Sequence, residues 1–91
     1  MEPFEIQQPA LSEVAEKEDV YDLVVFNDDV NTFDHVIEAL IRVCGHTPQQ
    51  AEQCTILVHY KGKCSVKKGS LAELTPLRTG ICDYGISAEI C

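Results

Sequence analysis

The 91-residue chain carries 15 acidic and 7 basic residues, for a formal net charge of −8, and 45% of its residues are hydrophobic. A chain of this length fits one domain with a single modest core, and the acidic balance argues against a nucleic-acid partner, because phosphate binding requires clustered lysines and arginines. The five cysteines include no CxxC pair, and neither a signal peptide nor a membrane-length apolar run is visible. We therefore expect a cytoplasmic protein with free thiols.

Taken in chain order, the first segment is polar. Residues 1–19 contain two prolines and an excess of acidic residues with little periodicity, which is typical of a flexible tail. Residues 20–91 would then form the folded domain. Its first element is a strand over residues 20–27, because this segment is rich in valine, leucine and aromatic residues and is bounded by acidic ones.

The clearest helix covers residues 32–44. Its apolar residues recur at spacings of three and four, which places them on one face. Asn31 or Thr32 can cap its start, and Gly45 can end it in a left-handed conformation.

A second helix follows at once. Thr47 is a suitable cap, Pro48 suits the first helical position, and Gln50 completes a capping box. Gly62 ends this helix, and the short alternating segment 63–67 predicts a second strand.

Ser70 and Glu73 form another capping-box pattern that opens a third helix. Proline cannot continue an uninterrupted helix without losing a hydrogen bond, so we expect a kink or a restart at Thr75–Pro76. Gly85 closes the helix, and residues 86–90 alternate as a last strand. The order β-α-α-β-α-β predicts an α+β domain, a small three-stranded antiparallel sheet packed by three helices.

The first strand ends abruptly in Asn27-Asp28-Asp29. Turn propensity and the helix that follows account for one acidic residue there, but less easily for two beside an amide. Adjacent like charges at this place favour a cationic ligand. Calcium is excluded, although Asn31 and Asp34 add oxygen donors, because an EF-hand loop needs a central glycine and a twelfth-position glutamate where this chain starts a helix.

His59 lies in the last turn of the second helix, where the helix dipole by itself favours a histidine. Zinc is disfavoured, since the pairings Cys44–His46, Cys54–His59 and His59–Cys64 lack the spacing of structural sites. A Cys-His hydrolase is disfavoured as well, because no cysteine is marked as activated.

Two motifs at a matching separation resemble the ClpS adaptors. They are "VVFNDDVNTFDHVIEALIRVCG" at residues 24–45 and "AEQCTILVHYKGKCSV" at residues 51–66. The resemblance implies a ClpS-like fold and an adaptor with neither catalysis nor cofactor. Such an adaptor recognises substrates that begin with a bulky hydrophobic residue (Leu, Phe, Tyr or Trp), an N-degron, and delivers them to a ClpA- or ClpC-type AAA+ unfoldase with the ClpP peptidase.

The family pattern also assigns site residues. The residues that it places around the substrate's α-amino group are Asn27, Asp28, Asp29 and His59. The residues that it places around the first side chain are Asn31, Phe33, Val36, Thr55, Val58 and Ile86. Phe33 departs from the pattern, because relatives carry a gating methionine at this position, and a rigid ring there would narrow or reshape the pocket.

Two other function classes compete with the Clp adaptor. One is a similar N-degron module that regulates or feeds a different protease or ligase. The other is a metal-binding or thiol-redox protein that uses the five cysteines. The leading interpretation implies a monomer with no membrane partner, in a bacterial cytoplasm rather than a plastid because no transit peptide is visible.

Overall fold

The computed structural model describes residues 19–91, so the predicted tail lies, apart from Asp19, outside the described residues. In the described part the elements follow the predicted order. They are β1 (Tyr21–Phe26), α1 (Phe33–Cys44), α2 (Pro48–Lys61), β2 (Lys63–Gly69), α3 (Leu71–Asp83) and β3 (Ala88–Ile90). The α+β class is therefore confirmed.

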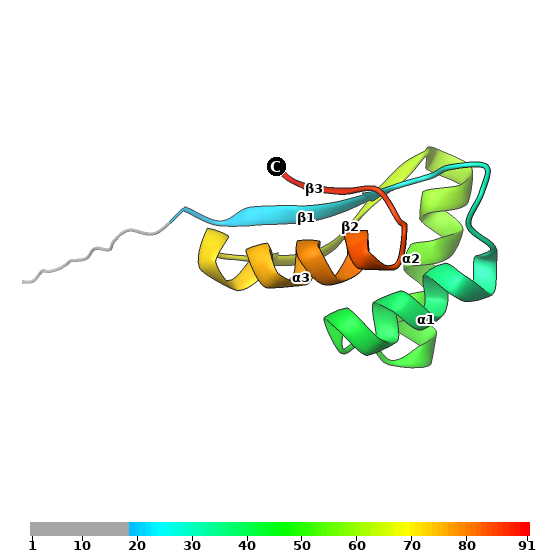
Figure 1. The fold of residues 1–91 in the computed structure, drawn as a ribbon, viewed down its shortest axis with the longest axis horizontal. Coiled ribbons are helices and arrows are strands. Elements are labelled where there is room, and N and C mark those ends of the chain that lie inside the picture. Colours follow the sequence, from blue (N-terminus) through cyan, green and yellow to red (C-terminus); the bar gives the residue numbers. More distant parts are fainter. Residues whose placement is uncertain (1–18) are drawn as a thin grey trace, which may run out of the picture.

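β1 is the central strand of the sheet, whose order is β2-β1-β3. It pairs with both neighbours in antiparallel register, Val25 facing Cys64 on one side and Ala88 on the other. Helix α3 lies along one face of the sheet, while α1 and α2 pack together at the end where β1 finishes (Figure 1). The loop that follows β1 therefore lies next to α1 and α2.

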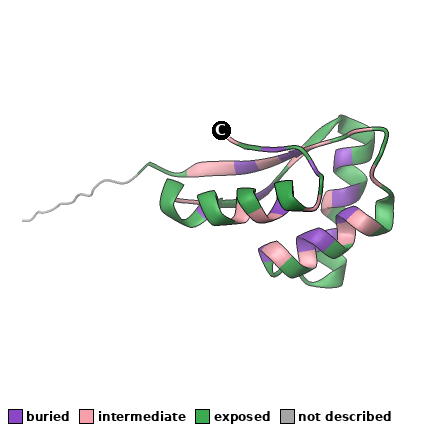
Figure 2. Ribbon diagram, in the orientation of Figure 1, coloured by how far each residue is buried: buried purple, intermediate pink, exposed green. Residues whose placement is uncertain are grey.

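The core joins this sheet to all three helices. Leu23 and Val25 of β1 are fully buried, as are Leu40 of α1 and Leu74 and Ile81 of α3. Figure 2 shows buried positions along β1 and on the helices that it meets. Burying each such side chain contributes about 1.5–3 kcal/mol, so this core sets the frame on which the loops are held.

The predicted caps are confirmed. The Thr32 hydroxyl accepts a hydrogen bond from the backbone N–H of His35 at 3.1 Å, and Gly45 ends α1 with a φ of 71°. Thr47 and Gln50 form the reciprocal capping box that opens α2. These local signals fix where α1 and α2 begin and therefore which way their side chains face.

Of the kink or restart predicted at Thr75–Pro76, the restart is wrong, because helix α3 continues through Pro76. The missing N–H of Pro76 leaves the carbonyl of Ala72 without its helical donor, but Ala72 and Pro76 are both exposed, and water can donate instead. The buried Leu74 and Ile81 on either side hold the helix against the sheet.

The last strand is shorter than predicted, Ala88–Ile90 rather than residues 86–90. Ile86 belongs to the turn that closes α3, because its N–H donates to the carbonyl of Ile81 at 3.4 Å. Its side chain is 3% exposed and lies in the core.

Candidate functional site

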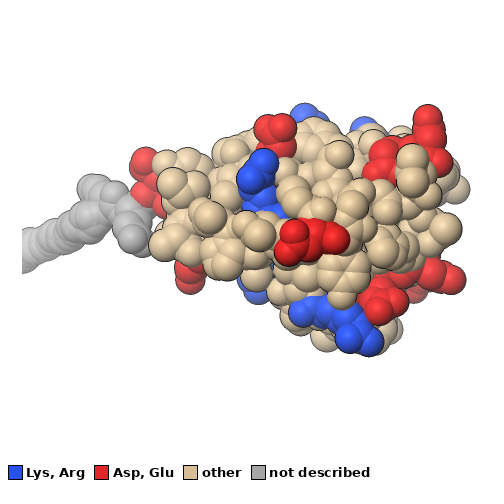
Figure 3. Space-filling view, in the orientation of Figure 1, with Lys and Arg blue, Asp and Glu red and all other residues tan. Residues whose placement is uncertain are grey.

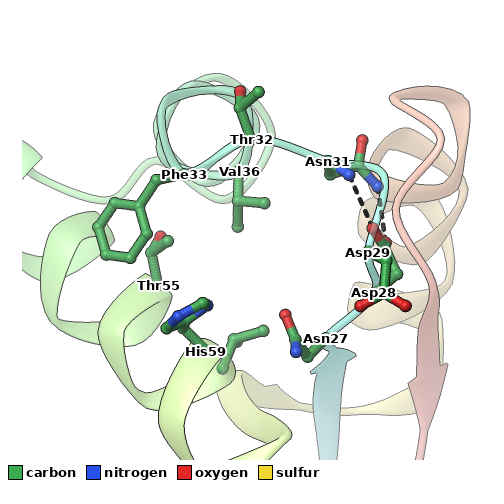
Figure 4. Close-up of a pocket in the computed structure, with 10 residues that line it drawn as sticks. Asn27, Asp28, Asp29, Asn31, Thr32, Phe33, Val36, Thr55 and His59 are labelled. Atoms are coloured by element: carbon green, nitrogen blue, oxygen red, sulfur yellow. Dashed lines mark hydrogen bonds between the residues drawn. The ribbon is translucent and has the colours of Figure 1, made fainter.

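One hydrogen bond brings the two sequence motifs together. The backbone N–H of Asn27, just after β1, donates to the carbonyl of Gly62 at 2.9 Å. Gly62 ends α2 with a φ of 90°, and its own N–H donates to Val58. Asn27 and His59 consequently stand at the same mouth, one from the sheet and one from the last turn of α2 (Figure 4).

The side chain of Asp28 forms hydrogen bonds within its own loop. One of its carboxylate oxygens accepts the backbone N–H groups of Val30 and Asn31 at 2.8 and 2.7 Å, and the other accepts the Asn31 side-chain amide at 2.7 Å. These bonds, led by the backbone N–H of Asn31, hold the pKa of Asp28 below its ordinary value. Asp29 next to it is exposed. The two adjacent carboxylates thus have different surroundings.

Asn31 also fastens the loop to a distant turn. Its amide nitrogen donates to Asp28 and to the carbonyl of Gly85 at 2.7 and 2.9 Å (dashed lines in Figure 4 mark the bonds with Asp28). An amide has two N–H donors, so both are used in these bonds.

His59 is exposed at the pocket rim and lies among aromatic rings. Its ring centroid is 6.1 Å from that of Phe33 at an interplanar angle of 75°, and 5.3 Å from that of Tyr60. Such edge-to-face arrangements are favourable for aromatic pairs. Within residues 19–91 the imidazole makes no hydrogen bond, so a ring nitrogen is available to a ligand.

The floor of the pocket is apolar. Val36 and Val58 are 8% and 3% exposed, whereas Phe33 at the entrance is 39% exposed. The Thr55 hydroxyl donates to the carbonyl of Ala51 at 2.7 Å, so this polar group is satisfied within α2. A side chain that enters the pocket therefore contacts the apolar side chains of Val36 and Val58. The Thr55 hydroxyl does not need a hydrogen-bond acceptor from the ligand, because it already donates to Ala51.

The cavity has a volume of about 360 Å³. The residues that line it are Asn27, Asp28, Asp29, Asn31, Thr32, Phe33, Val36, Thr55, Val58 and His59. Nine of the ten predicted site residues are thus brought together. Ile86 is not, because its side chain is in the core, and Thr32, which the sequence pattern marked only as a helix cap, lines the cavity as well.

The pocket lining contains two carboxylates and neither lysine nor arginine. Figure 3 shows acidic side chains distributed over the face in view, including the end that carries the loop between β1 and α1. The two carboxylates at the pocket itself are those of Asp28 and Asp29. A negative potential of this kind favours a cationic ligand group.

Cys44 and Cys54 are not activated thiols. All five cysteines are free, and burial raises the pKa of the Cys54 thiol to about 11 and that of Cys44 above its ordinary value. Thiols with raised pKa values are poor nucleophiles at neutral pH. Between residues 19 and 91 no group of three or more histidine, cysteine or acidic side chains is arranged to hold a metal ion. Nor, over the same residues, is any helix long and apolar enough to cross a bilayer.

The fold and the pocket define a small α+β domain with a cavity whose acidic, amide-bearing mouth lies above an apolar floor. A family model described as "ATP-dependent Clp protease adaptor protein ClpS" matches residues 16–88. The chain belongs to the ClpS family.

Two curated relatives and one solved structure are similar to this chain. An ATP-dependent Clp protease adapter protein ClpS from Nostoc sp. strain PCC 7120 is 44% identical over 50 residues, which are 54% of this chain and 52% of that protein. The mouse E3 ubiquitin-protein ligase UBR2 is 34% identical over 77 residues, which are 85% of this chain and 4% of the ligase. Agrobacterium tumefaciens ClpS2, solved bound to L-phenylalaninamide, superposes with a TM-score of 0.66 at 14% identity, over 82% of this chain and all of that one. The match thus spans about half of the adapter and a small part of the ligase.

Proposed function

We propose that this chain is an adaptor without catalytic activity, which binds proteins through a bulky hydrophobic N-terminal residue and delivers them to a Clp protease. The observation that carries the proposal is the single cavity in which an acidic, amide-bearing mouth meets an apolar floor. An N-degron presents two features that complement this cavity. Its first residue carries both a charged α-amino group and an apolar side chain.

The amine binds at the mouth. An α-amino group has a pKa of about 7.7–8.0 and is mostly charged at neutral pH. Asn27 accepts through its amide oxygen and His59 through a ring nitrogen. Asp29 supplies charge, and because it is exposed, its contribution is screened to about 1 kcal/mol or less. Acetylation removes both the charge and donors, which leaves the acceptors unpaired.

The first side chain enters the cavity. Val36 and Val58 form its floor, Thr55 its wall and Phe33 its entrance. Burial of a leucine or phenylalanine side chain contributes about 1.5–3 kcal/mol, so the preferred first residues are Leu, Phe, Tyr and Trp. ClpS2 of Agrobacterium tumefaciens, with its bound phenylalaninamide, supports this ligand class.

Delivery involves a ClpA- or ClpC-type AAA+ unfoldase with ClpP, which supplies the ATP hydrolysis. The adaptor acts as a monomer without a cofactor, in the cytoplasm of a bacterium. Residues 1–19 serve as the delivery tail of the folded domain at residues 20–91.

A second candidate has a specific observation in its favour. The similarity to mouse UBR2 covers 85% of this chain, which fits an N-degron module that serves a ubiquitin ligase. Both candidates share the pocket and differ in the partner.

A degradation assay separates the two candidates. A fluorescent reporter that begins with leucine is incubated with ATP and ClpA–ClpP or ClpC–ClpP, with and without the full chain. The adaptor proposal predicts faster degradation, and loss of that stimulation when residues 1–19 are deleted while peptide binding persists. Peptide binding without stimulation of either unfoldase would contradict delivery and favour the ligase module.

A further inference from the structure

The structure assigns positioning roles to Asn31 and His35. Both fasten the start of α1 to the turn at Tyr84–Gly85, and this brace holds the Asn27–Asp29 loop in the shape that the amine requires. Asp28 then serves mainly as the internal acceptor that shapes the loop. The binding consequences rest on the proposed function, but the brace itself is a property of the free protein.

The first half of the brace is the pair Asp28–Asn31. The Asp28 carboxylate accepts three hydrogen bonds from residues 30 and 31, all between 2.7 and 2.8 Å. An ionised carboxylate has about four acceptor sites, and these bonds, which are of the strong, charge-assisted kind, occupy three of them. Most of the accepting capacity of Asp28 is therefore used within the loop. Asn31 in turn has both amide protons engaged, one by Asp28 and one by the carbonyl of Gly85.

The second half is His35, in the first turn of α1. Its Nε2 lies 2.7 Å from the carbonyl oxygen of Tyr84. A carbonyl only accepts, so Nε2 carries the proton and donates it. The two rings also stack in a tilted arrangement, with centroids 5.5 Å apart. Asn31 and His35 thus bind two successive carbonyls of one turn.

That turn is a firm anchor. The N–H of Tyr84 donates to Ile81 at 3.0 Å and the N–H of Gly85 to Cys82 at 2.9 Å. Gly85 has a φ of 80°, a conformation that strains any residue with a Cβ. The next residue, Ile86, is 3% exposed in the core. Ile86 therefore acts on the pocket through the turn that it anchors, without lining the cavity.

The test compares four single variants with the wild-type chain. Asn31→Ala removes both side-chain donors, His35→Leu removes the donor to Tyr84, and His35→Gln keeps an amide donor of similar reach. His46→Gln is the matched control, because His46 Nε2 also lies 2.7 Å from a backbone carbonyl, that of Val66, and His46 does not line the pocket. Each variant is assayed by NMR for the Asp28 side-chain pKa and for amide exchange at residues 30 and 31, and by anisotropy for a leucine-initiated peptide.

The brace predicts that Asn31→Ala returns the Asp28 pKa toward its ordinary value and speeds exchange at residues 30 and 31. It also predicts about three- to tenfold weaker peptide binding, less than the full effect of the two lost hydrogen bonds because the amine keeps its own acceptors. His35→Leu should likewise speed amide exchange and weaken peptide binding. His35→Gln should restore most of the wild-type exchange rate and affinity, and His46→Gln should leave both at the wild-type level. An Asp28 pKa and exchange rates unchanged in Asn31→Ala would overturn the brace. Equal loss in His35→Gln and His35→Leu would overturn the role of His35. If the free protein behaves as predicted but the wild type binds no peptide, the brace stands and the proposed function fails.

Discussion

The backbone N–H of Asn27 donates to the carbonyl of Gly62 at 2.9 Å, and this bond joins the two halves of the pocket mouth. Gly62 ends the helix that carries His59, so the position of the imidazole depends on the end of β1. Asn27 and Gly62 are more than thirty residues apart in the sequence, yet they form one site because the sheet and α2 meet at this bond.

Replacement of His59 by alanine should weaken binding of a leucine-initiated peptide at least about tenfold, or ~1.4 kcal/mol, because the amine loses one of its acceptors. The fold should be unaffected, since His59 is exposed. Anisotropy titration and thermal unfolding give the two readouts. Glu52→Ala, an exposed position on the same helix, is the control. Wild-type affinity in His59→Ala would show that the imidazole does not bind the amine.

Substitution of the two adjacent aspartates should have different effects. Asp28→Ala should lower the free energy of unfolding by about 1 kcal/mol as well as weaken binding, because the N–H groups of the loop lose their acceptor. Asp29→Ala should weaken binding, most clearly at low salt, and leave unfolding unchanged. Chemical denaturation and anisotropy at two salt concentrations measure both. Equal changes in unfolding free energy and in binding for the two variants would show that Asp28 and Asp29 do not have different roles.

The contribution of Asp28 to stability should depend on pH in one direction. The folded-state pKa of Asp28 is lowered from its ordinary value of 3.8, so the contribution is complete above the unfolded-state pKa and is lost as pH falls through the folded-state pKa. The pKa of Asp22 is lowered as well, chiefly by Lys68, so the wild-type profile alone does not isolate Asp28. The Tm difference between the wild type and Asp28→Asn should be constant near neutral pH and shrink below about pH 4. A Tm difference that grows as the pH falls would show that the pKa of Asp28 is not lowered in the folded state.

Phe33→Ala should broaden the set of accepted first residues more than it lowers the affinity for leucine. The ring is 39% exposed at the entrance and edge-on to His59, so its removal should widen the entrance while Val36 and Val58 still form the apolar floor. Anisotropy with peptides that begin with Leu, Phe, Tyr, Trp and Ile measures the selectivity. An identical ranking in the two proteins would show that Phe33 does not select.

Short-range chemistry explains why so much of the fold could be predicted from the sequence. Thr47 with Gln50 and Ser70 with Glu73 carry their capping boxes within four residues. Gly45 ends its helix by its own conformational freedom. The pocket residues that follow from the family pattern also fall into one cavity, apart from Ile86.

What could not be predicted depends on contacts between distant residues. Ile86 alternates as a strand residue would, but its N–H returns to Ile81 and its side chain enters the core. Asp28 and Asp29 are indistinguishable in the sequence, and only the fold shows that Asn31, held by Gly85, engages the first of them. Pro76 is accommodated because the neighbouring buried residues outweigh its missing hydrogen bond.

The central claim is that the cavity binds a free α-amine together with an apolar side chain. Its most direct test is fluorescence anisotropy of the full chain with short peptides that differ only at the first residue, Leu, Phe, Tyr, Trp, Arg or Asp, and with an acetylated leucine peptide. The account predicts binding of the free Leu and aromatic peptides, and about a hundredfold weaker binding or none for the acetylated one, a loss of ~2.7 kcal/mol. Equal binding of the free and acetylated leucine peptides, or no binding of any peptide, would contradict it.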